Sequence, residues 1–90
     1  MISEGTPTQA TVYVRRVLEA ALRASAAAIV LAHNHPSGEP SPSAEDDTTT
    51  RNLDRAAVAV GLVLIDHVVI GGETYYSYAD SGRLQGFREG

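Results

Sequence analysis

The sequence predicts an α/β fold, an α/β sandwich built on a small mixed sheet. Segments with the apolar periodicity of helices alternate with short apolar runs of strand length, and glycines and prolines separate them. In chain order the predicted elements are helix, strand, helix, strand and strand, which is typical of helices packed against a sheet. The chain has 90 residues, the length of one domain.

The first expected element is an amphipathic helix over residues 12–25. Apolar side chains recur there at the spacing of one helix face, and charged side chains occupy the opposite face. The residues of the apolar face are Val14, Val17, Leu18, Ala21 and Leu22. Residues 27–32 then form a short, continuous apolar run, the pattern expected of a central strand covered on both faces. This strand leads directly to His33.

A rigid loop and a second helix are expected next. The segment 34–42 contains three prolines and a glycine, which are incompatible with a regular helix and with a strand ladder. The second helix is predicted to start at Ser43, and Gly61 is placed to end it as a left-handed C′ residue. The apolar face of this helix consists of Leu53, Ala56, Ala57 and Val60.

Two further strands are predicted in the last third of the chain. Residues 62–70 are apolar apart from one polar pair, and two consecutive glycines mark a turn into a third strand over residues 74–79. The polar pair is Asp66 and His67. We interpret it as satisfied locally or reaching solvent at a sheet edge. In the alternative, His67 holds the free N–H of a metal-binding histidine.

Three tyrosines in the third predicted strand follow an approximate alternation of side chains, which indicates a strand with one face exposed. They are Tyr75, Tyr76 and Tyr78. Tyrosines in such a pattern are more typical of sheet packing than of a substrate platform. The tail from Asp80 onward is too short, and too polar at its end, to support a prediction.

The composition excludes several classes of function. The net charge is −4 and the seven basic residues are scattered arginines, so no basic stripe indicates nucleic-acid binding through this chain. No apolar run is long enough for a membrane span, and residues 1–10 lack the regions of a signal peptide, so we expect a cytoplasmic protein. Without cysteines, any bound metal must be held by His, Asp or Glu.

His33 and His35 are candidate metal-binding residues. If both leave the strand in an extended conformation, their side chains project from the same face. Asp46 lies one turn into the following helix, and a return of the chain through the proline-rich loop would bring its carboxylate beside both imidazoles. Three N/O ligands with a fourth position open to water are typical of a catalytic zinc site.

Helix capping is an alternative interpretation of the same segment. Ser43 can be the N-cap that accepts the backbone N–H of Asp46, and acids in the first turn complement the helix dipole. The two interpretations are compatible. Capping uses the serine and the backbone, and the Asp46 carboxylate can still face a metal.

The stretch HNHPSGEPSPSAED, from His33 to Asp46, resembles the signature of the JAMM (MPN+) zinc metalloprotease family, which is His-x-His, seven residues, then Ser-x-x-Asp. HNHPSG is similar to the bacterial RadC-like branch, as are EGT, VYVRRVLEAAL and LIDHVVIGGETYYSYADSG elsewhere in the chain. The resemblance implies one RadC-like JAMM/MPN domain over residues 1–90, truncated at its N-terminus. The implied fold is a JAMM/MPN-like (cytidine-deaminase-like) α/β/α sandwich that lacks its first strand or strands.

The resemblance also implies a role for each candidate residue. His33, His35 and Asp46 ligate Zn²⁺, and Ser43 donates a hydrogen bond to the tetrahedral intermediate. Such a donor at a developing oxyanion contributes about 3 kcal/mol to a transition state.

The family's general base has no clear equivalent in this sequence. In the family it is a glutamate on an earlier strand, upstream of the Gly5-Thr6 pair, where it takes a proton from the zinc-bound water. Glu4 is the acid nearest to that place and lies too close to the turn to be equivalent. We therefore expect the base to lie outside this chain, with Glu4 as the alternative.

The implied function is zinc-dependent hydrolysis of peptide or isopeptide bonds in a protein or peptide substrate. The alternative is a non-catalytic metal-binding or partner-binding module of a longer protein associated with DNA repair, to which the family was historically linked. A zinc deaminase has a similar layered fold, but its Pro-Cys-x-x-Cys motif is absent. The sequence predicts neither the substrate nor the oligomeric state.

Overall fold

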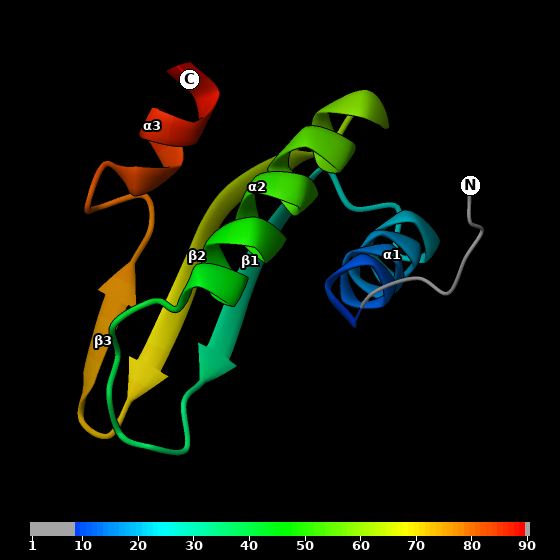
Figure 1. Cartoon of the computed structure of the whole chain (residues 1–90). Helices are drawn as coiled ribbons and strands as arrows, with labels where there is room; N and C mark the ends of the chain where they lie inside the picture. The colour runs from blue at the N-terminus through cyan, green and yellow to red at the C-terminus, as the bar shows by residue number, and fades with distance from the viewer. Residues whose placement is uncertain (1–8, 90) are drawn as a thin grey trace, which may run out of the picture.

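A computed structural model describes residues 9–89 of the chain (Figure 1). The described elements are α1 Gln9–Arg23, β1 Ala28–Asn34, α2 Ala44–Ala59, β2 Val63–Gly71, β3 Thr74–Ser77 and α3 Arg83–Glu89. The predicted order of the first five elements and the α/β class are confirmed. The helix α3 is an addition, because its seven residues hold too few apolar side chains to give a periodic signal.

The three strands form one mixed sheet in the order β1-β2-β3, with β1 parallel to β2 and β2 antiparallel to β3. The prediction that residues 27–32 form a central strand covered on both faces is wrong for the described structure, because β1 is an edge strand. Its residues alternate, with Ile29 and Leu31 buried and Val30 60% exposed. The run is apolar on both faces, but the described helices cover only one of them.

An irregularity in the β1–β2 pairing changes which residues of β2 face the core. Ile29 pairs with Leu64 and Val30 pairs with Asp66, so Ile65 is an extra residue on β2. Leu64 is fully buried before this bulge, and His67 and Val69 are buried after it. A strand without the bulge would place Leu64 and His67 on opposite faces, because side chains alternate with a period of two.

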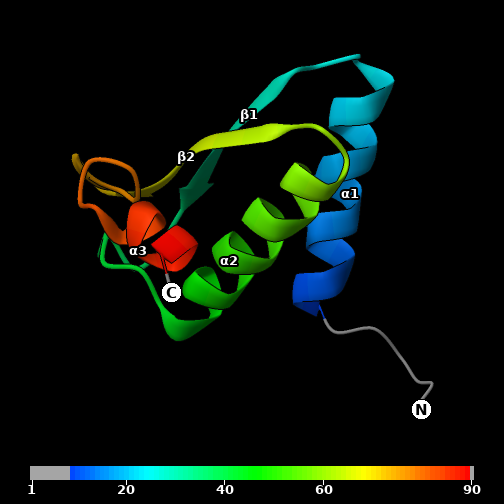
Figure 2. The same cartoon turned by 90° about the horizontal axis from the view of Figure 1, so that it is seen from above.

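The helix α2 packs on one face of the sheet, and α1 and α3 pack against α2. In Figures 1 and 2, α2 runs along β1 and β2, with α1 on one side and α3 on the other. Their apolar faces meet the inner face of the sheet in one core that includes Val14, Leu53, Leu64 and Leu84. None of the helices in residues 9–89 has the length and apolar content that a bilayer crossing requires.

The element boundaries differ from the predicted ones by a few residues. The helix α1 starts at Gln9 and ends at Arg23, and Leu22, assigned to its apolar face, is 53% exposed. The helix α2 starts after Ser43, and Gly61 has a positive φ of 80°, as predicted for its C-terminal end. Apolar periodicity marks the buried face of a helix, but terminal turns are set by backbone hydrogen bonds.

Candidate metal centre

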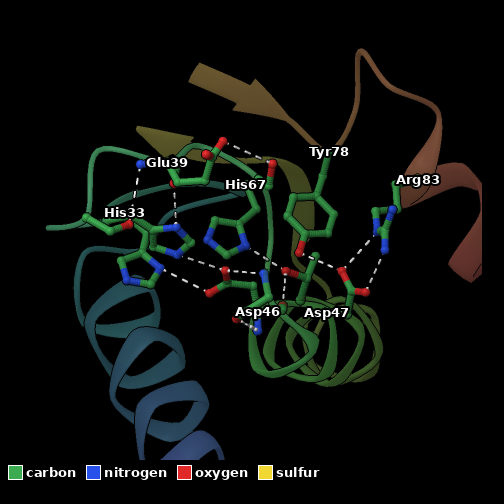
Figure 3. A network of polar contacts seen from close by, with 12 residues as sticks. His33, Glu39, Asp46, Asp47, His67, Tyr78 and Arg83 are labelled. Carbon is green, nitrogen blue, oxygen red and sulfur yellow. Dashed lines mark hydrogen bonds and ion pairs between the residues drawn. The ribbon is translucent and has the colours of Figure 1, made fainter. Parts of the chain in front are cut away.

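His33, His35 and Asp46 meet where β1 ends. One nitrogen or oxygen atom from each of these residues lies within 4.8 Å of the others. His33 Nδ1 is 3.2 Å from Asp46 Oδ1, and His35 Nε2 is 3.0 Å from Asp46 Oδ2. Figure 3 shows this group at the N-terminal end of α2. The predicted proximity of the two imidazoles and the carboxylate is confirmed.

The strand geometry places both histidines on one face. His33 belongs to β1 and pairs with Val69, and the backbone N–H of His35 donates to Ile70 O at 2.8 Å. The ladder therefore continues one residue beyond β1, so the two side chains keep the period of a strand. Their ring centroids are 4.9 Å apart. The His33 side chain is 45% exposed and the His35 side chain 17%, so the group opens to solvent on the His33 side.

The start of α2 orients Asp46. The Ser43 hydroxyl accepts the Asp46 N–H at 3.0 Å, and Asp46 Oδ2 accepts the Ser43 N–H at 2.9 Å. This is a complete capping box, so the predicted N-cap is confirmed and coexists with the histidine contacts. Because the Ser43 oxygen accepts in the cap, its proton can be donated to the Asp46 carboxylate or to a further acceptor.

The same contacts hold Asp46 in its ionised form. Burial by itself would raise the pKa of the Asp46 carboxyl. The hydrogen bonds from the Ser43 backbone and side chain and the nearby His33 and His35 outweigh burial, and the pKa lies below the ordinary value of 3.8. A carboxylate that stays ionised and accepts directional hydrogen bonds is suited to bind a cation.

The backbone carbonyl of Glu39 orients the His35 ring. His35 Nδ1 donates to Glu39 O at 2.9 Å. A carbonyl oxygen only accepts, so Nδ1 carries a proton, and the lone pair of a neutral imidazole lies on Nε2, which faces Asp46. Metal-binding histidines are commonly held in this way. This contact was not predictable from the sequence, because a backbone carbonyl leaves no signal in residue type.

Close packing against Gly71 holds that part of the loop in place. A Cβ atom at Gly71, the last residue of β2, would lie 2.5 Å from Pro40 N and 2.6 Å from Glu39 C. Real side chains do not approach backbone atoms so closely. Only glycine therefore lets the loop lie against the end of β2, where Glu39 reaches His35.

The Asp66 carboxylate is satisfied locally, because it accepts the His67 N–H, but His67 itself does not reach solvent at a sheet edge and lies in the core beside this group. It is 2% exposed, and its ring is nearly parallel to that of His33, with centroids 6.2 Å apart. Its Nδ1 is 2.6 Å from Thr50 Oγ1. Burial, only partly opposed by nearby carboxylates, lowers the pKa of His67 below 6.5, which favours the neutral ring. The bulge at Ile65 explains the inward orientation.

Tyr78 also departs from the predicted strand, because β3 ends at Ser77 and Tyr78 is fully buried. Its hydroxyl donates to Asp47 Oδ1 at 2.7 Å, and burial raises the pKa of that hydroxyl. Arg83 forms two hydrogen bonds to the Asp47 carboxylate, at 2.9 and 2.8 Å. Figure 3 shows this network beside Asp46, where it ties α3 to α2.

No glutamate among residues 9–89 joins His33, His35 and Asp46 in the candidate metal centre. Glu4, the alternative candidate for the general base, lies outside the described residues. The described part therefore presents two imidazole nitrogens and a carboxylate, together with the Ser43 hydroxyl.

An α/β domain with a mixed sheet and a His-x-His pair facing a helix-borne aspartate has the features of a JAB-type domain. A sequence model of the family described as "RadC-like JAB domain" matches residues 1–83. The chain belongs to this family.

Three relatives illustrate the similarity. The chain is 46% identical over 83 residues to a UPF0758 protein of Trichlorobacter lovleyi, which covers 92% of the chain and 36% of that protein. It is 47% identical over 85 residues to UPF0758 protein STH371 of Symbiobacterium thermophilum, or 94% of the chain and 36% of the relative. With UPF0758 protein HEAR2468 of Herminiimonas arsenicoxydans the identity is 46% over 80 residues, or 89% and 36%. The chain thus spans about a third of the length of these relatives.

Proposed function

We propose that this chain is the zinc-binding part of a hydrolase that cleaves peptide or isopeptide bonds with a metal-activated water. The observation that carries this proposal is the convergence of His33, His35 and Asp46 within 4.8 Å. Two imidazoles and one carboxylate form the ligand set of a catalytic zinc site with an open position, and the solvent-exposed side of His33 leaves room for that position.

The side chains around the group fit a zinc ion. The Glu39 carbonyl holds the His35 lone pair on Nε2, and the capping box holds the ionised Asp46 carboxylate toward both imidazoles. Bound Zn²⁺ supplies Lewis-acid chemistry, polarising a carbonyl and lowering the pKa of water toward ~7.

Ser43 has a separate role in this proposal. Its oxygen is engaged in the cap, and its proton can be donated to a carbonyl oxygen of the substrate that becomes negatively charged. The proposed substrate is a protein or peptide, whose amide carbonyl such a donor and such a metal can activate together. The general base is contributed from outside residues 9–89.

Metal analysis and a peptide-cleavage assay test the proposal. Protein purified without chelator should contain about one zinc per chain, and His35→Ala should lose it. The matched control is Asn34→Ala, which changes the exposed residue between the two histidines and should keep the metal. Absence of zinc from the wild type, or its retention in His35→Ala, would refute the site.

Catalysis requires its own measurement on the full-length protein. Cleavage of a fluorogenic peptide mixture that disappears in His35→Ala supports the hydrolase. A non-catalytic metal-binding or partner-binding module, the alternative favoured by the absence of a glutamate from the described group, predicts stoichiometric zinc and no cleavage.

A further inference from the structure

His67 is a buried titratable residue to which the proposed hydrolysis gives no role. Its ring is nearly parallel to the Tyr78 ring, with centroids 5.1 Å apart, and to the His33 ring, with centroids 6.2 Å apart. Figure 3 shows His67 between these two residues, with one ring nitrogen bonded on the Tyr78 side and the other on the opposite side, where His33 lies. The unbonded nitrogen therefore lies on the side of the candidate metal centre.

Thr50 determines which nitrogen of His67 carries the proton. Thr50 Oγ1 is 2.7 Å from the backbone oxygen of Asp46 and 2.6 Å from His67 Nδ1. The carbonyl can only accept, so it takes the single hydroxyl proton, and the Thr50 oxygen accepts from Nδ1–H of His67. In a neutral ring, Nε2 then has an unprotonated lone pair.

This lone pair is buried without a donor among residues 9–89. A buried acceptor without a partner costs free energy, so its presence calls for a reason beyond packing. The bulge at Ile65 turns His67 to the inner face, whereas regular alternation from Leu64 would have turned Asp66 and Val68 there. The group of three possible metal-binding atoms does not include His67.

We propose that His67 is a positioning residue of the metal centre, and that its Nε2 accepts a hydrogen bond from an N–H or O–H group held beside His33 at the metal centre. The inference rests on the proposed function, because bound Zn²⁺ brings the donor there. Thr50 fixes the ring orientation and proton position, so that the acceptor is ready before the metal binds.

Nitrogen NMR of the histidine side chains in metal-free protein tests the first part. The expected spectrum shows His67 protonated on Nδ1 and unprotonated on Nε2. A His67 ring protonated on Nε2 would overturn the inference, whether or not the protein binds metal.

Two substitutions of His67 separate its nitrogens. His67→Asn keeps an amide near the Nδ1 position but no atom at Nε2, and His67→Gln reaches the Nε2 position with an amide oxygen. We expect His67→Asn to weaken Zn²⁺ binding about 10- to 100-fold and His67→Gln to restore most of that loss. Equal affinities of the two variants would overturn the inference, since a purely structural histidine gives Gln no advantage.

Thr50→Val provides a second measurement, because valine keeps the shape of threonine and removes the hydroxyl. It should allow the His67 ring to populate both tautomers and should lower Zn²⁺ affinity in the direction of His67→Asn. Thr48→Val is the matched control, since Thr48 is exposed and its hydroxyl bonds only to Ala44 O among the described residues. A tautomer unchanged in Thr50→Val would overturn the assigned hydrogen-bond direction.

The failure of this inference is distinguishable from the failure of the proposed function. A wild type that binds no Zn²⁺ overturns both. Zn²⁺ binding that depends on His35 but is unchanged in His67→Asn overturns only the role of His67.

Discussion

Ser43 and Asp46 are joined by two hydrogen bonds that run in opposite directions, from Asp46 N–H to the Ser43 hydroxyl at 3.0 Å and from Ser43 N–H to Asp46 Oδ2 at 2.9 Å. The same Oδ2 atom is 3.0 Å from His35 Nε2. One turn of helix thus performs two tasks, because the contact that begins α2 also aims a carboxylate at the candidate metal centre.

Two substitutions of Ser43 separate its role in stability from its role in peptide cleavage, because Ser43→Ala removes both the cap and the hydroxyl proton and Ser43→Asp removes only the proton. Alanine removes the cap and should lower the free energy of unfolding by about 0.5–2 kcal/mol. Aspartate restores a capping acceptor but donates no proton, so it should recover stability without recovering peptide cleavage. Urea unfolding and the peptide assay measure the two effects. Full activity in Ser43→Asp would contradict the role proposed for the hydroxyl.

Gly71→Ala should weaken metal binding although Gly71 contributes no side chain. The added Cβ would meet Pro40 N and Glu39 C at 2.5 and 2.6 Å and push the loop away from β2. We expect a loss of about 1–3 kcal/mol in stability and weaker Zn²⁺ binding, because Glu39 no longer orients His35. Gly86→Ala is the control, since Gly86 lies in α3 and a Cβ added there would meet no atom within 4 Å. It should be neutral or slightly stabilising in thermal unfolding.

The Asp47 carboxylate should make stability depend on pH. Hydrogen bonds from Arg83, with a further one from Tyr78, lower the pKa of Asp47 in the folded chain despite burial. Its stabilising contribution is therefore complete above the unfolded value of about 3.9 and is lost as the pH falls through the lower folded value.

The measurement compares urea unfolding at pH 6 and pH 3. Asp47→Asn and Arg83→Gln should each lose less stability on acidification than the wild type. Because the Arg83 side chain is 44% exposed, Arg83→Gln should cost only about 0.5–1 kcal/mol at pH 6. An unchanged acid response in Asp47→Asn would show that other carboxylates account for it.

Leu64 and Ile65 are neighbours in β2 with opposite environments, which provides a test of the bulge. Leu64 is fully buried and Ile65 is 52% exposed. Leu64→Ala should lower the free energy of unfolding by about 2–5 kcal/mol, because it leaves a cavity in the core. Ile65→Ala should cost under about 1 kcal/mol by the same measurement. The reverse order would mean that the strand register is wrong.

Local patterns in the sequence determined much of this protein. The His-x-His spacing puts His33 and His35 on one face because a strand has a period of two, and Ser43 begins a helix because its hydroxyl can accept from a residue three positions later. Both relationships depend on atoms close together in the chain. The order of the first five elements was predictable for the same reason.

Only the tertiary structure decided how the site is supported. The carbonyl of Glu39 orients His35 because Gly71, far along the chain, leaves space for the loop. His67 faces the core because the pairing of β2 with β1 contains an extra residue. These features depend on strand register and on contacts between distant segments. Such contacts form only when the sheet and α2 pack together. Periodicity and residue type therefore do not encode them.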